Sequence, residues 1–247
     1  MFRAHELIGS LRNDSEEYKD CMTSIKFYLG DIDGVADMYR ASTLSFFKLP
    51  FEVCLFQVTQ AMDVHFFLAK QVGDNVYWKR FGKQLNDGFR WIQEDIELIL
   101  NPAENITSAK RSSTGDILNI INDQEYELLS PSERWTISQC ISVAGAIEVF
   151  SCNNVITIEN TPPKFINSKR IKKNKVPFLS YRTLHIVSRN IGINHSSNGG
   201  GRESPRLHLR RGHIRTYENG LKTWVSSCIV GDKTKGFSSH DYKVRFG

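Results

Sequence analysis

The sequence predicts an α+β fold, with a mixed helical and antiparallel-sheet N-terminal body and a C-terminal antiparallel β-meander. The aromatic, apolar run over residues 51–58 has the composition of a strand. Ser130-Pro131-Ser132-Glu133 combines an N-cap, a proline at N1 and a capping-box glutamate, which predicts a helix to about Ser151. Asn219-Gly220 between two further apolar runs is a strong hairpin signal.

The N-terminal part of the chain is expected to begin with helices and continue with strands. Ser15 follows Asn13-Asp14 and precedes two glutamates, which is typical of a helix start, and Tyr18, Cys21, Met22 and Ile25 follow at helical spacing. A second helix is expected over residues 33–48, before Pro50. Apolar runs then predict strands over residues 51–58, 63–71 and 76–81. Residues 72–75, which include Gly73, are predicted to form the hairpin turn between the last two of these strands.

The middle and the end of the chain alternate between helix, loop and strand patterns. Phe89, Ile92, Ile96 and Ile99 form an i, i+3, i+7, i+10 stripe that predicts a helix over residues 86–100, ended by Pro102. The polar residues 101–115 and the glycine-rich residues 190–204 are expected to be loops. Further strands are predicted over residues 155–159, 181–187, 207–217, 222–230 and 241–246.

The charge of the chain is divided between its two ends. The net charge of +5 is the sum of −9 for residues 1–160 and +14 for residues 161–247. This division predicts an acidic α+β body over residues 1–160, a basic linker or arm with one strand over 161–203, and a basic β-meander over 204–247. The basic part is therefore the candidate contact surface for a polyanion.

Several classes of protein are excluded by the composition. No stretch has the roughly 20 apolar residues of a membrane span, and the N-terminus lacks the pattern of a secretory signal. Five scattered cysteines without a CxxC pair fit reduced thiols in a cytosol. There is no Walker or Rossmann glycine loop, no GxSxG elbow and no convincing set of metal ligands. We therefore expect a cytoplasmic protein without a cofactor or a metal.

The densest group of reactive side chains runs from Ser204 to Arg215 and includes His208-Leu209-Arg210-Arg211-Gly212-His213. Arginines suit bidentate contact with phosphate, and histidines can act as general acid and base near neutral pH. Three interpretations stay open: a solvated basic edge strand, a surface that binds a phosphate backbone, and a metal-independent ribonuclease that uses His208 and His213. The candidate nucleic-acid-binding residues here are Arg206, Arg210, Arg211, Arg215, Lys222 and Trp224. Trp224 could stack on a base, although a single tryptophan in such a strand is more often part of a core.

A second basic feature has six lysines or arginines between Lys164 and Lys175. One interpretation is a solvated linker. The other is an arm that lies along a polyanion and binds less tightly as the salt concentration rises. Its candidate binding residues are Lys169, Arg170, Lys172, Lys173 and Lys175.

The C-terminal third resembles a known group of proteins. Pro205, His208, Arg210-Arg211-Gly212-His213 and Trp224-Val225 look like the C-terminal signature of phage and plasmid accessory proteins. That family includes a type V-A anti-CRISPR protein that depletes the messenger RNA of its target effector nuclease. The resemblance covers about residues 162–246, and Ile214 stands where the family commonly has tryptophan. It implies a mobile-element protein that acts in a bacterial cytoplasm against host defence.

Charge and resemblance together lead to one functional hypothesis and two alternatives. The hypothesis is an anti-defence or host-takeover protein that binds a host nucleic acid or ribonucleoprotein, such as an effector of a defence system, through its basic third. The first alternative is the His208/His213 ribonuclease. The second is an inhibitor that binds a protein of a nucleic-acid-binding host complex.

Overall fold

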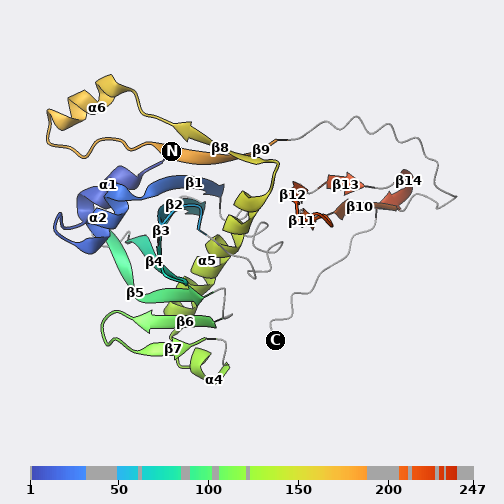
Figure 1. Cartoon of the computed structure of the whole chain (residues 1–247), viewed down its shortest axis with the longest axis horizontal. Coiled ribbons are helices and arrows are strands. Elements are labelled where there is room, and N and C mark those ends of the chain that lie inside the picture. Colours follow the sequence, from blue (N-terminus) through green and yellow to red (C-terminus); the bar gives the residue numbers. More distant parts are fainter. Residues whose placement is uncertain are drawn as a thin grey trace.

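A computed structural model describes residues 2–31, 49–60, 63–84, 90–101, 106–120, 123–187, 206–210, 213–225, 228–230 and 232–237. It confirms the α+β class, because helices pack on a large mixed sheet (Figure 1). In the described residues this sheet has nine strands in the order β7-β6-β5-β4-β3-β2-β1-β9-β8.

The strands of this sheet come from both sides of the predicted boundary at residue 160. Neighbours from β2 to β7 pair antiparallel, whereas β1 pairs parallel with both β2 and β9, and β8 pairs antiparallel with β9. The segment after residue 160 therefore contributes β9 to the interior of the sheet. The strands are β1 (Ile25–Asp31), β2 (Val53–Gln60), β3 (Asp63–Val72), β4 (Asn75–Gln84), β5 (Arg90–Asn101), β6 (Ile106–Arg111), β7 (Ile117–Asn119), β8 (Val155–Asn160) and β9 (Tyr181–Ile186).

Helices cover the two faces of the sheet and form two separate apolar cores. One face is covered by α5 (Pro131–Ile147) and the short helix η1 (Glu148–Ser151), where Phe56 and Trp78 pack in one cluster with Ile137. The other face is partly covered by α1 (Ala4–Ser10) and α2 (Glu16–Thr23), whose Leu7 and Cys21 share a cluster with Phe66. The remaining helices among the described residues are α4 (Asp123–Tyr126) and α6 (Lys164–Ile171).

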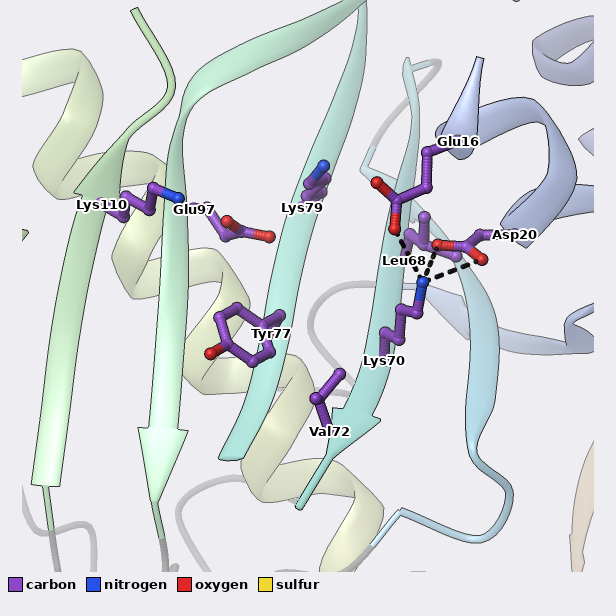
Figure 2. Close-up of a pocket in the computed structure, with 9 residues that line it drawn as sticks. All are labelled: Glu16, Asp20, Leu68, Lys70, Val72, Tyr77, Lys79, Glu97 and Lys110. Atoms are coloured by element: carbon purple, nitrogen blue, oxygen red, sulfur yellow. Dashed lines mark hydrogen bonds and ion pairs between the residues drawn. The ribbon is translucent and has the colours of Figure 1, made fainter. Parts of the chain in front are cut away.

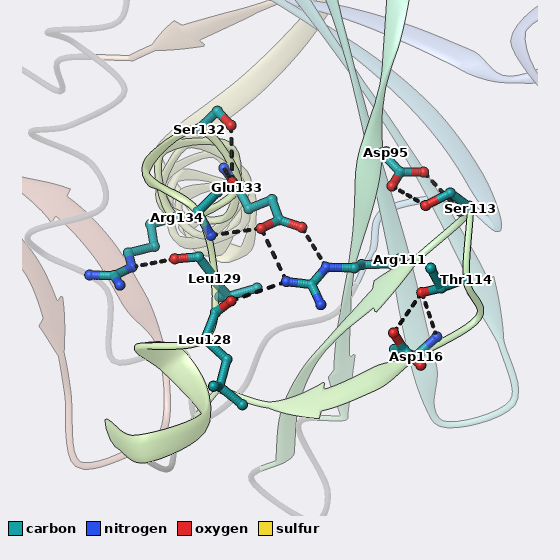
Figure 3. Close-up of polar contacts among 11 residues, drawn as sticks. Asp95, Arg111, Ser113, Thr114, Asp116, Leu128, Leu129, Ser132, Glu133 and Arg134 are labelled. Carbon is teal, nitrogen blue, oxygen red and sulfur yellow. Dashed lines mark hydrogen bonds and ion pairs between the residues drawn. The ribbon is translucent and has the colours of Figure 1, made fainter.

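The predicted capping box at the start of α5 is confirmed. The Glu133 amide donates to the Ser130 hydroxyl at 3.3 Å, and the Glu133 carboxylate accepts from the Ser130 amide at 2.7 Å. Arg111 of β6 donates from Nε to the same carboxylate at 2.7 Å (Figure 3). Chiefly through this hydrogen bond, Arg111 lowers the pKa of Glu133 to about 2. The contact ties the first turn of the long helix to the sheet.

Three of the predicted elements are wrong in the residues that can be checked. Residues 90–101 form strand β5 in place of a helix, residues 25–31 form strand β1, and residues 106–111 of the predicted loop form β6. In β5 the buried residues Ile96, Leu98 and Leu100 alternate along the strand. Pairing with β4 and β6 on both sides decided between the two periodicities in favour of the strand. The helix predicted over residues 33–48 lies outside the described residues.

The C-terminal strands form two small sheets in place of one continuous meander. The predicted Asn219-Gly220 hairpin is confirmed between β11 (His213–Thr216) and β12 (Lys222–Val225), with Gly220 at φ +78°. Strand β10 (Arg206–Arg210) pairs antiparallel with β13 (Cys228–Val230) and parallel with β14 (Asp232–Phe237), which lies between the predicted strands 222–230 and 241–246. The β11–β12 hairpin packs on the body. Strands β10 and β13, which come before and after the hairpin in the sequence, pair with each other. The loop 190–204 and the strand 241–246 lie outside the described residues.

Candidate functional site

The segment between β8 and β9, residues 161–180, is a folded basic arm. Its helix α6 projects past the end of the sheet next to α1 (Figure 1). The chain returns from α6 along α1, where the Phe178 ring meets the His5 ring edge-on at 4.5 Å and Val176 packs against the core under α1. The expected arm is therefore a helix held on the body, in contrast to a solvated linker.

The inner side of α6 is fixed to this returning segment by side chains. The Asn167 amide donates to the Phe178 carbonyl and accepts from the Phe178 amide, both at 2.8 Å. Arg170 donates from Nε to the Val176 carbonyl at 2.8 Å, and its guanidinium lies 4.2 Å from the centre of the Phe178 ring. Of the predicted binding residues, Arg170 therefore has a structural role in holding the arm.

The outer side of α6 and the turn after it present free cations. Lys164, Lys172, Lys173 and Lys175 are exposed, and their side chains make no ion pair or hydrogen bond with any residue that the structure describes. Lys169 lies 5.8 Å from the centre of the Phe165 ring, which is itself 64% exposed. Because residues 160–202 contain no aspartate or glutamate, no carboxylate in that segment neutralises these lysines. Such a surface can contact several phosphates at once.

Three of the residues predicted to bind nucleic acid, Arg215, Lys222 and Trp224, lie on the β11–β12 hairpin. Lys222 and Trp224 hold this hairpin on the body. Trp224 is 7% exposed and packs in a cluster with Val149 and Cys152. This burial supports a role in the core for Trp224 and not a role in stacking on a base. The Lys222 ammonium pairs with the Glu148 carboxylate at 2.8 Å.

Two asparagines complete this docking contact. The Asn154 amide donates to the Trp224 carbonyl and accepts from the Trp224 amide, both at 2.8 Å. Asn153 donates from its main chain to the Lys222 carbonyl and accepts from the Thr223 hydroxyl, also at 2.8 Å. Asn153 and Asn154 were not among the predicted site residues, although adjacent asparagines shortly after a helix suit such a contact.

The remaining predicted residues are only partly placed. His213 is half-buried opposite Val225, and Arg215 is exposed on the same strand. The side chains of Arg206, His208, Arg210 and Arg211 lie outside the described residues, so the proposed acid–base pair stays a prediction. In Figure 1 the C-terminal strands lie at the opposite end of the molecule from α6, so the two basic features do not form one surface.

A groove on the α2 side of the sheet also contains several lysines (Figure 2). It measures about 280 Å³ and lies between α2 and strands β3 to β6. Lys70 pairs with Glu16 at 2.8 Å and with Asp20 at 3.0 Å, and Lys79 pairs with Glu17 at 2.9 Å. These lysines are neutralised inside the molecule, so the groove is a poor candidate for a polyanion.

The row of charges continues across the floor of this groove. Glu97 of β5 stands opposite Lys79 of β4 and Lys110 of β6 in the sheet register. Burial is the largest influence on the Glu97 carboxyl and raises its pKa, while the two lysines act in the opposite direction. With three lysines and three carboxylates on its lining, the groove has no net charge.

One buried polar cluster was missed by the sequence analysis. Arg80 of β4 is 3% exposed, donates to Nδ1 of His65 at 2.9 Å, and lies 4.1 Å from the centre of the Trp135 ring. Burial, followed by the charge of Arg80, lowers the pKa of His65 to about 4. Glu94 pairs with Arg80, while the buried Nε of Arg80 has no hydrogen-bond partner among the described residues.

The described residues hold neither a metal-type cluster nor a disulfide. No group of three or more histidine, cysteine, aspartate or glutamate side chains there could hold a metal ion. Cys21, Cys54, Cys140 and Cys152 are buried free thiols. In the same part of the chain, no helix combines the length and the apolar character that crossing a membrane requires.

Comparisons of the chain with protein-family models, with curated proteins and with solved structures give no match.

Proposed function

We propose that this chain is a mobile-element anti-defence or host-takeover protein that binds nucleic acid, free or in a ribonucleoprotein, in a bacterial cytoplasm. The anti-defence role rests on the resemblance of the C-terminal third. The binding role rests on one structural observation, the basic arm, whose exposed lysines have no partner among the described residues.

The charge of the arm is what supports a polyanion as its partner. Residues 161–187 contain seven lysines and arginines and no acidic residue. Each cation that replaces a counterion at a phosphate releases that ion, so binding weakens steeply with salt. Asn167 and Arg170 attach α6 to the returning segment, so the backbone of the arm loses little conformational entropy when the lysines engage.

The acidic body directs the contact to the residues that follow it. Residues 1–160 carry a net charge of −9, which repels a polyanion from the surface of the body. The partner is therefore steered to the basic segments after residue 160, among them the arm, which leaves the body available for contact with a protein.

The test is direct binding of fluorescently labelled RNA and DNA, single-stranded and duplex, measured by anisotropy at low salt. Lys172→Glu/Lys173→Glu reverses two free cations, and we expect its affinity to fall by about 100-fold. The matched control is Arg12→Glu/Lys19→Glu, which makes the same charge change at two exposed residues of the body. We expect the control to bind nucleic acid within about twofold of the unchanged protein, because salt screens charges that are distant from the bound strand.

The same assay separates the alternatives. Equal losses in both double variants would mean that only net charge matters, and absence of binding to every nucleic acid at low salt would refute the proposal. Intact strands after incubation with a chelator are expected for a binding protein. Cleavage that disappears in His213→Ala would instead support the ribonuclease.

A further inference from the structure

We infer that the arm binds single-stranded nucleic acid and that one unpaired base enters an apolar pocket beneath α6. This inference rests on the proposed function, because it assigns the bases of the same strand whose phosphates contact the lysines. The pocket lies where the chain leaves β8, turns through Pro162 and Pro163, and enters α6.

The pocket has the size and walls that suit one flat ring system. It measures about 220 Å³, below the roughly 300–1,000 Å³ of pockets that enclose drug-sized ligands. Its lining includes Pro162, Ile166 and Phe178, together with Tyr181, whose ring stacks on the Phe2 ring at 4.8 Å. An apolar, aromatic lining favours a base over a sugar or a phosphate.

Two polar side chains at the rim can contact the edge of a base. The Asn160 amide nitrogen donates to the Ile158 carbonyl at 3.3 Å and to the Thr183 hydroxyl at 3.2 Å. These bonds fix the amide and leave its carbonyl oxygen without a partner among the described residues. Thr161 is exposed beside it and adds a hydroxyl group. An acceptor and a hydroxyl beside an apolar slot are the usual means of reading the edge of an unstacked base.

The helical period of α6 places the pocket and the lysines next to each other. Ile166, Asn167 and Arg170 lie on the inner side, where Ile166 lines the pocket and the other two hold the returning segment. At about 100° per residue, Phe165 falls between Lys172 and Lys169 on the outer side. A base can stack on the exposed Phe165 ring while the lysines contact the neighbouring phosphates, as in other proteins that bind single strands.

The arrangement favours a single strand over a duplex or a lipid surface. Bases of a duplex are stacked and paired, so they cannot enter a pocket without being extruded. A helix that lies in a membrane interface needs one continuous apolar face. The two exposed apolar residues of α6, Phe165 and Ile171, are six residues apart and point about 120° away from each other.

The test uses a 12-nucleotide single strand that carries 2-aminopurine at one central position, because the fluorescence of this base reports its environment. With the unchanged protein we expect a fluorescence change that saturates together with the anisotropy. Thr161→Phe places a ring in the pocket without removing a core side chain, and we expect it to abolish the fluorescence change. Thr157→Phe makes the same exchange at an exposed threonine within β8, outside the pocket lining, and should leave the change intact.

A second variant tests the stacking surface without touching the pocket. We expect Phe165→Ala to weaken binding of the single strand by roughly 5- to 150-fold and to leave duplex binding within about twofold. Normal circular dichroism of both variants would show that the fold is intact.

Each outcome separates this inference from the proposed function. The inference would be overturned if the protein bound single strand and duplex with equal affinity and if Thr161→Phe kept the fluorescence change of the unchanged protein. The proposal of nucleic-acid binding would then still stand. Absence of all nucleic-acid binding, or binding to anionic lipid vesicles alone, would overturn both.

Discussion

The two basic features of the chain use their cations in opposite ways. On the arm, Lys172 and Lys173 lie in the exposed turn after α6 and have no partner among the described residues. On the β11–β12 hairpin, Lys222 is held by Glu148 at 2.8 Å and Trp224 is buried against the body. A similar composition therefore produces a free surface in one place and an internal docking contact in the other. Whether a carboxylate lies within reach decides between the two.

The groove on the α2 side supports the same conclusion. Lys70 and Lys79 are close to a pocket, yet Glu16, Asp20 and Glu17 neutralise them. Lysines next to a concave surface are thus a weak sign of an anion site unless the opposing charges have also been counted.

The largest effect is expected from Trp224→Ala. Removing a buried tryptophan leaves a cavity and costs about 3–5 kcal/mol, here in the docking of the hairpin on Val149 and Cys152. Hydrogen exchange of the amides in residues 213–225 should accelerate strongly, while exchange in β2 to β5 stays slow. If the hairpin amides kept their protection, the hairpin would not be held by Trp224. Trp224→Phe is the conservative control and should retain most of the protection.

A second large effect is expected at His65, inside the body. Its pKa is about 4 in the folded protein and 6.5 in the unfolded chain, so the unfolded chain binds a proton first as the pH falls. Stability should therefore decline between pH 6.5 and pH 4, by up to about 3 kcal/mol.

His65→Gln tests this pH dependence, because glutamine can still accept the hydrogen bond from Arg80 but does not titrate. Chemical unfolding at pH 7 and pH 4.5 measures the difference. The variant should lose less stability than the unchanged protein over this range, and an identical loss in both would contradict the assignment.

Smaller effects are expected at Lys222 and Lys173: replacing Lys222 should lower stability, and replacing Lys173 should lower nucleic-acid affinity. Lys222→Gln leaves the buried Glu148 carboxylate with less compensation and should cost about 2 kcal/mol of stability. It should not change nucleic-acid affinity. Lys173→Gln should leave the melting temperature unchanged and weaken binding several-fold. Thermal unfolding and anisotropy on the same two proteins test both halves, and weaker binding in Lys222→Gln would place the hairpin back in the contact surface.

The sequence predicted well those elements whose signals are local. The capping box at Ser130 and Glu133 and the turn at Gly220 depend on neighbours within a few residues, and both are confirmed. Residues 90–101 failed because their isoleucines fit a helix and a strand equally well. Only pairing with β4 and β6, which are distant in sequence, decides the outcome.

The positive charge of the arm could be predicted from the sequence, but the geometry of its pocket could not. The run from Lys164 to Lys175 identified the arm, since a segment without acidic residues has no internal means of neutralisation. Its pocket could not be predicted, because Phe2 and Tyr181 are brought together across most of the chain. The burial of Lys222 and Trp224 likewise depends on Glu148 and Val149, more than 70 residues away.

The most direct test of the central claim is the salt dependence of binding to a single strand. The unchanged protein is compared with Lys164→Gln/Lys172→Gln/Lys173→Gln over a series of salt concentrations. Loss of three phosphate contacts should reduce the slope of log K against log salt by about 2. Parallel lines for the two proteins would show that these lysines do not touch the strand, and would contradict the assignment of the arm as the binding surface.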